Sequence, residues 1–144
     1  MTDSKNDTNE ISIGVVGLGM MGCSICTCLL MAGHPVIAVA PIPDDLKHAE
    51  KRIKEHLRKS REEGLINGDV TDYYKNCLLT EDYNHLSGCY LVIECTIENL
   101  DIKNTVYKKI EAVIAATSLL ASNTSAIPIS SRVSPSPRSS ANST

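Results

Sequence analysis

The feature that most constrains the fold of this chain is a glycine-rich turn at residues 17–22 (GLGMMG). Residues 11–16 (ISIGVV) precede it and are rich in β-branched side chains, which is typical of a buried strand. Residues 20–32 follow it and predict a helix that ends at Gly33. In this strand–turn–helix context, the G-x-G-x-x-G spacing is typical of a backbone that surrounds a pyrophosphate at a helix N-terminus. The turn therefore predicts a dinucleotide-binding βαβ unit.

Each glycine of the turn has its own expected role. Gly17 permits the tight turn, Gly19 lets the backbone approach a pyrophosphate closely, and Gly22 lets the helix pack against the strand. We therefore expect a cofactor to contact the whole turn, which consists of Gly17, Leu18, Gly19, Met20, Met21 and Gly22.

Strand and helix patterns alternate along the rest of the chain. Further strands are predicted at residues 35–40, 77–80 (an edge strand), 90–95 and 118–121, and helices at 43–63, near 73–75 and at 99–116. This alternation predicts an α/β fold of the Rossmann type, with a doubly wound, mostly parallel sheet in a single domain. The chain contains no Phe or Trp, so its core must be aliphatic, which suits a buried parallel sheet.

The chain divides into three predicted regions. Residues 1–10 are polar and predict a flexible arm, residues 11–129 form the domain, and the Ser- and Pro-rich residues 130–144 predict a disordered tail. The net charge of -3 does not indicate binding to nucleic acid or to a membrane surface, and the apolar runs are too short for a transmembrane helix. Six cysteines without a secretory signal favour reduced thiols and a cytoplasmic location.

One element of the dinucleotide pattern is missing. An acidic residue usually ends the second strand, about 20 residues after the glycines, and binds the adenosine ribose hydroxyls. Ala40 occupies this position, so we expect a weak cofactor contact there. Asp44 and Asp45 come later and are expected to stabilise the N-terminus of the next helix. No Arg follows the strand, so NADP is not indicated.

From residue 12 to about residue 129, the chain resembles the NAD-binding domain of the 3-hydroxyacyl-CoA dehydrogenases of fatty-acid β-oxidation. The matching segments are IGVVGLGMMG (13–22), AGHPV (32–36), LVIECTIENLDIKN (91–104) and LASNTSAI (120–127). The E-N-L-x-x-K and S-N-T-S segments make the resemblance specific. It implies NAD as cofactor, an acyl-CoA substrate, hydride transfer between L-3-hydroxyacyl-CoA and NAD, and dimerisation through a second domain that this sequence lacks.

The resemblance also implies roles for four further residues. Glu98 and Lys103 correspond to residues beside the ribose and nicotinamide of NAD. Ser125, with Asn123 beside it, corresponds to the loop at the nicotinamide and the substrate carbonyl. All four follow predicted strand ends, where open α/β sheets bind ligands. Turn capping or stabilisation of a helix N-terminus would explain Glu98, Asn123 and Ser125 without any ligand.

The family's general base is a His in an H-F-x-N-P segment, which the 144 residues do not contain. We therefore expect a truncated, catalytically inactive cofactor-binding module. The alternatives are a non-catalytic nucleotide-binding or structural relative, which the loss of the ribose carboxylate at Ala40 favours, and a fragment of a hydroxyisobutyrate-type dehydrogenase.

Two other groups of residues invite a functional interpretation. Cys23, Cys26 and Cys28 fall within a predicted helix without a second ligand pair, so we interpret them as packing residues and expect no metal site. The helix at 43–63 corresponds to one that touches coenzyme A in the family, and its Arg58, Lys59 and Arg61 could supply a basic contact. A solvated charged face explains the same residues.

Overall fold

The computed structural model describes residues 11–96 and 99–122, so the predicted arm and tail lie outside the described residues. Five parallel strands form one sheet in the order β3-β2-β1-β4-β5. The strands are β1 (Ile13–Val16), β2 (Val36–Val39), β3 (Cys77–Thr80), β4 (Leu91–Glu94) and β5 (Leu119–Ser122). The predicted doubly wound sheet is confirmed, and its described part is parallel throughout.

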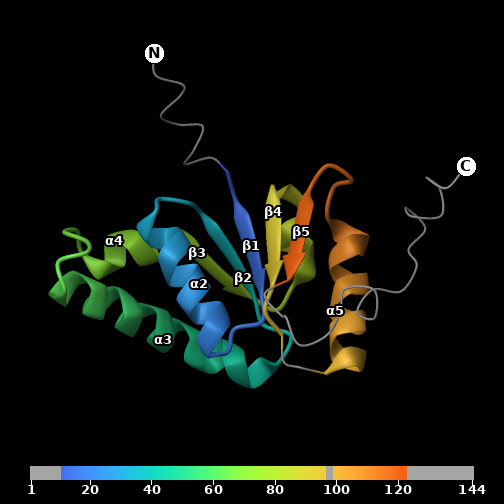
Figure 1. Cartoon of the computed structure of the whole chain (residues 1–144), viewed down its shortest axis with the longest axis horizontal. Coiled ribbons are helices and arrows are strands. Elements are labelled where there is room, and N and C mark those ends of the chain that lie inside the picture. Colours follow the sequence, from blue (N-terminus) through green and yellow to red (C-terminus); the bar gives the residue numbers. More distant parts are fainter. Residues whose placement is uncertain (1–10, 97–98, 123–144) are drawn as a thin grey trace, which may run out of the picture.

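Helices cover both faces of this sheet, as Figure 1 shows. The elements are α2 (Met20–Met31), α3 (Pro43–Glu62), α4 (Val70–Tyr74), the 3-10 helix η1 (Tyr83–Gly88) and α5 (Leu100–Val113). Helices α2 and α3 pack on each other over one face, and α5 packs with η1 over the other. None of these helices has both the length and the apolar character of a membrane span.

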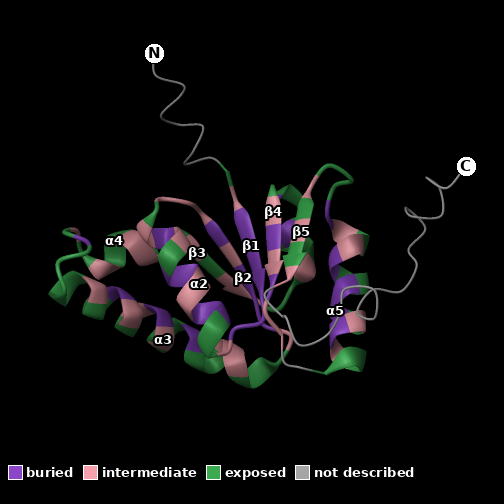
Figure 2. Ribbon diagram, in the orientation of Figure 1, coloured by how far each residue is buried: buried purple, intermediate pink, exposed green. Residues whose placement is uncertain are grey.

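The core consists of two aliphatic layers separated by the sheet. Val15 and Ala38 face α2 and α3, whereas Val16 and Val39, their chain neighbours, face α5 and η1. This alternation follows from the two-residue period of a strand, and here both faces are buried. Figure 2 shows buried residues through the central strands and along the inner side of the helices.

Helix α2 ends as the sequence predicts, at a glycine. Gly33 has a φ of 95° and donates its N–H to Leu30 O, while the N–H of His34 reaches Leu29 O. These two bonds form a Schellman motif, which uses the carbonyls left free at a helix C-terminus. The motif also directs the chain back into β2.

The sequence pattern does not predict η1. Its six residues are mostly polar, and a 3-10 turn of this length has too few residues to show an apolar period. The side chain of Asp82 accepts a hydrogen bond from the N–H of Asn84 and caps the turn. Leu86 is the one fully buried residue of η1, and it packs where Gly14 leaves space on β1.

Candidate functional site

A cleft lies where the carboxyl ends of three strands meet. The chain runs from β1 outward through β2 and β3 and then crosses to β4 on the other side of β1, so the strand order reverses between β1 and β4. In open α/β sheets, ligands bind at this reversal, outside the carboxyl ends of the strands. The cleft is lined from β1 by Gly17 and Gly19, from the β2 side by Pro41, Ile42 and Asp45, and from the β4 side by Cys95, Thr96 and Ile102.

Gly17 makes the turn possible because no other residue fits there. Its φ is +105°, and a Cβ at this residue would lie 2.7 Å from both the carbonyl carbon and the carbonyl oxygen of Cys95. The Gly17 N–H also donates to Val39 O at 2.9 Å, which ties the turn to the end of β2. The turn is therefore fixed between the strands on either side of β1.

Gly22 and Gly19 face very different surroundings. A Cβ on Gly22 would lie 1.7 Å from Gly17 O, so a side chain there would force the helix away from the turn. Apart from its chain neighbours, a Cβ on Gly19 would meet no described atom within 4 Å, although Gly19 lines the cleft. The packing role predicted for Gly22 is confirmed, and Gly19 leaves the turn open on the side where a ligand would approach.

The N-terminus of α2 also fits an anion. The first four N–H groups of a helix have no partner within the helix, and no side chain caps α2. Together with the positive end of the helix dipole, free N–H groups favour a phosphate. The turn and the start of α2 therefore fit a pyrophosphate without any charged side chain.

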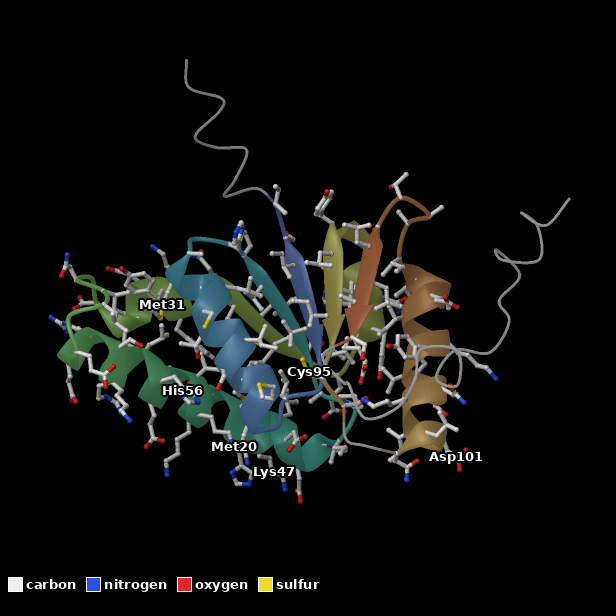
Figure 3. All side chains as sticks on the ribbon, viewed as in Figure 1. Met20, Met31, Lys47, His56, Cys95 and Asp101 are labelled. Atoms are coloured by element: carbon white, nitrogen blue, oxygen red, sulfur yellow. The ribbon has the colours of Figure 1, made fainter. Side chains whose placement is uncertain are left out.

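The other three turn residues differ in exposure. Leu18 is fully buried in the core layer beneath α2, so only its backbone can contribute to a site. Met20 and Met21 are 68% and 58% exposed at the start of α2. Figure 3 shows Met20 at the same edge of the sheet as Cys95. These two methionines are large apolar side chains that directly follow Gly19 in the chain.

An arginine that the sequence analysis did not single out holds the turn from α3. The Nη1 of Arg52 donates to Leu18 O at 3.1 Å and lies 3.8 Å from Asp45 Oδ1. The contact joins residues 34 apart in the sequence. No local pattern could have revealed it, because it depends on how α3 packs against α2.

Ala40 directly follows β2, which ends at Val39; it is 2% exposed and belongs to the core layer. Its N–H donates to Thr80 O, so its backbone continues the sheet. Asp44 and Asp45 both lie in the first turn of α3, as predicted. The side chain of Asp44 is 81% exposed and 3.8 Å from Lys47, whereas that of Asp45 is 25% exposed. Of these two, Asp45 lines the cleft.

On the β4 side, a buried ion pair supports the cleft. Lys103 Nζ lies 2.7 Å from Glu94 Oε2, both side chains are fully buried, and Nζ also donates to Thr96 O at 2.8 Å. The Thr96 N–H and hydroxyl donate to the same carboxylate, as does the hydroxyl of Ser122. Since Thr96 lines the cleft, this network fixes the cleft wall. Sequence analysis did not identify Glu94, because an acidic residue at a strand end gives no sign of a buried partner.

Burial alone would raise the pKa of the Glu94 carboxyl. The hydrogen bonds from Lys103 and Thr96 outweigh this effect and hold the pKa of Glu94 below its ordinary value. Glu94 is therefore the ionised partner of Lys103 at neutral pH. Lys103 is fully buried, and the contacts described for its amino group are with Glu94 and Thr96. The predicted contact of Lys103 with a cofactor stays a prediction.

The remaining predicted site residues lie outside the described residues. These are Glu98, Asn123 and Ser125. The strand β5 ends at Ser122, directly before Asn123, and at the same edge of the sheet as the glycine turn.

The cysteines and histidines form no ligand cluster among the described residues: no group of three or more His, Cys, Asp or Glu side chains there could hold a metal ion. All six cysteines are free thiols. Cys23 and Cys26 are buried on the face of α2 that packs in the core, and burial raises the pKa of both thiols. Burial also raises the pKa of Cys95, which lines the cleft, to about 11.

The three basic residues that could contact coenzyme A, Arg58, Lys59 and Arg61, are exposed along α3.

The sheet order, the glycine turn and the cleft together define a dinucleotide-binding domain of the Rossmann class. The family model described as "3-hydroxyacyl-CoA dehydrogenase, NAD binding domain" matches residues 12–139, which extends past residue 129. The chain therefore belongs to the 3-hydroxyacyl-CoA dehydrogenase family, through its NAD-binding domain.

Individual relatives agree with this assignment. The chain is 32% identical over 128 residues to the mitochondrial hydroxyacyl-coenzyme A dehydrogenase of Homo sapiens, covering 83% of this chain and 40% of that protein. It is 30% identical over 119 residues to a probable 3-hydroxybutyryl-CoA dehydrogenase of Deinococcus radiodurans, covering 83% and 43%. The crystal structure of 3-hydroxybutyryl-CoA dehydrogenase from Escherichia coli superposes with a TM-score of 0.76 at 26% identity, covering 87% of this chain and 29% of that one. The chain thus spans less than half the length of these relatives.

Proposed function

We propose that this domain binds NAD across the carboxyl ends of β1, β2 and β4. The observation that carries the proposal is the contrast within the glycine turn. Gly17 and Gly22 are closed in by backbone, whereas Gly19 opens onto the cleft at the uncapped start of α2. A turn of this shape fits a pyrophosphate group, and the family to which the chain belongs supports NAD as the cofactor.

NAD, when bound, supplies a hydride acceptor, and we propose that its nicotinamide half lies on the β4 side. Thr96, held by Glu94 and Lys103, forms the described wall on that side. The family resemblance assigns Glu98 and Lys103 to the ribose and nicotinamide. Lys103 supports this region at least through Thr96 O, to which its amino group donates.

We further propose that the domain serves hydride transfer between L-3-hydroxyacyl-CoA and NAD in fatty-acid metabolism. The relatives named as acyl-CoA dehydrogenases support an acyl-CoA substrate. Asn123 and Ser125 would bind near the substrate carbonyl, and the exposed Arg58, Lys59 and Arg61 could contact coenzyme A phosphates. Dimerisation through a second domain stays a prediction of the family resemblance. The free thiols support a reducing compartment, for which we propose the cytoplasm.

Binding and turnover can be tested separately on the 144-residue polypeptide. Oxidation of a hydroxyl to a ketone needs a general base, and the family's H-F-x-N-P histidine segment does not occur in these residues. We expect NADH binding by fluorescence titration, without NADH oxidation in the presence of acetoacetyl-CoA. Turnover that Ser125→Ala abolishes would contradict the expected inactivity, and failure to bind NADH would favour a structural relative.

A further inference from the structure

The β2 side of the cleft lacks the acidic residue usual at the strand end but contains an acidic residue from the next helix. Ala40 is 2% exposed and packs in the core layer. Asp45, in the first turn of α3, lines the cleft together with Pro41, Ile42 and the two turn glycines. Among the described residues that line this cleft, Asp45 contributes the one carboxylate.

Arg52 of α3 links the side chain of Asp45 to the glycine turn. The Nη1 of Arg52 lies 3.8 Å from Asp45 Oδ1 and donates to Leu18 O at 3.1 Å. At 3.8 Å the contact is an ion pair rather than a hydrogen bond, so it orients the carboxylate without using its acceptor sites. The two side chains are 25% and 31% exposed. The pair therefore lies between the surface and the core, beside the turn.

We propose that the Asp45 carboxylate accepts hydrogen bonds from the adenosine ribose hydroxyls of NAD, in place of the acidic residue missing at Ala40. The proposal rests on the proposed NAD site and assigns its adenosine half. Because β2 and β4 lie on opposite sides of β1, the β2 side of the turn is the side where dinucleotide-binding domains place this ribose. Asp45 lines the cleft from that side, in the first turn of the helix that follows β2.

The same pair predicts a preference between the two nicotinamide dinucleotides. A carboxylate beside the ribose repels a 2′-phosphate, and Asp45 also neutralises Arg52, the nearest cation to it. Removing the charge of Asp45 would end the repulsion and leave Arg52 without its counter-ion. The change that weakens NAD binding should therefore strengthen NADP binding.

The test compares Asp45→Asn with its chain neighbour, Asp44→Asn. Asp44 is 81% exposed and does not line the cleft, so it controls for loss of one negative charge at the start of α3. Calorimetry should show that Asp45→Asn binds NAD about 10-fold more weakly, since a hydrogen bond to a charged acceptor is replaced by one to a neutral acceptor. The same variant should bind NADP more tightly, since the carboxylate no longer repels the 2′-phosphate. Asp44→Asn should change each dissociation constant less than about 2-fold.

A second arm uses the unaltered chain and an NAD analogue whose adenosine ribose lacks the 2′-hydroxyl. The analogue should bind the unaltered chain several-fold more weakly than NAD, and this difference should be smaller in Asp45→Asn, whose neutral amide oxygen accepts a weaker hydrogen bond. Equal binding of NAD by the unaltered chain and a folded Asp45→Asn overturns the proposal, as does equal binding of NAD and the analogue by the unaltered chain. If NAD binding persists in either case, the proposed NAD site stands without Asp45, whereas no binding of NAD to the unaltered chain overturns both.

Discussion

The chain offers a direct comparison between a buried and an exposed Lys–Glu ion pair. Lys103 Nζ lies 2.7 Å from Glu94 Oε2 with both side chains fully buried. Lys54 Nζ lies 2.6 Å from Glu50 Oε2 with side chains 37% and 54% exposed. The distances are nearly the same, but the buried pair also makes hydrogen bonds with Thr96 and Ser122, and Lys54 Nζ lies 4.9 Å from the centre of the Tyr74 ring. Replacing each lysine by methionine compares what the buried and the exposed lysine contribute to stability.

The expected magnitudes differ several-fold. Lys103→Met leaves the Glu94 carboxylate buried without its cation, and breaking a buried pair in this way costs roughly 3–5 kcal/mol. Thr96 and Ser122 still donate to Glu94, so we expect a loss near the lower end, about 3 kcal/mol. Lys54→Met removes a solvent-screened contact and should cost less than about 1 kcal/mol. The larger loss is a substantial part of the roughly 5–15 kcal/mol by which a domain is stable.

Urea unfolding followed by circular dichroism at pH 7 measures both losses. A double variant, Lys103→Met with Glu94→Gln, should recover part of the loss, since no unpaired charge then remains buried. If Lys103→Met and Lys54→Met lower the free energy of unfolding by the same amount, the Glu94–Lys103 pair does not stabilise the strand end as described. The cleft wall at Thr96 would then not depend on this ion pair.

Three further outcomes follow from the structure. Gly19→Val should remove NADH binding, measured by fluorescence, while the melting temperature stays close to that of the unaltered chain. By contrast, Gly22→Val should abolish cooperative melting, because its Cβ would lie 1.7 Å from a backbone oxygen. The pKa of Glu94 is lower in the folded than in the unfolded chain, so its stabilisation is fully present above the ordinary pKa of a glutamate carboxyl and is lost as the pH falls through the lower folded value. Urea titrations from pH 6 to pH 3 should show this loss, and Glu94→Gln should reduce it. Ala40→Asp should lower the free energy of unfolding in urea by more than about 1 kcal/mol, because the residue is 2% exposed in the core layer.

The sequence predicted the architecture because its strands and helices carry clear apolar patterns. The predicted edge strand at residues 77–80 is β3 with the same bounds, and α3 buries Ala49, Ile53 and Leu57 along one stripe, as the spacing indicates. The roles of Gly17 and Gly22 were predictable because they depend on the local turn. Predicting these features requires only residues that are close together in the sequence.

The supports of the cleft could not be predicted in the same way. Arg52 reaches Leu18 from 34 residues away, and Ser122 reaches Glu94 from 28 residues away, so both contacts exist only after the helices and strands have packed. The sequence places Asp45 at a helix start, where dipole stabilisation is a sufficient explanation. Its position in the cleft depends on how α3 lies against the glycine turn.

The central claim is that NAD binds at the carboxyl ends of β1, β2 and β4, and a residue-resolved titration tests it most directly. Backbone amide chemical shifts of the isotope-labelled 144-residue chain can be followed by nuclear magnetic resonance as NAD is added. We predict saturable changes that are largest at residues 17–22, 40–45 and 95–96. Residues of α4, and residues of β3 before its carboxyl end, should not change. No saturable change, or changes centred on the amino ends of the strands, would contradict the claim.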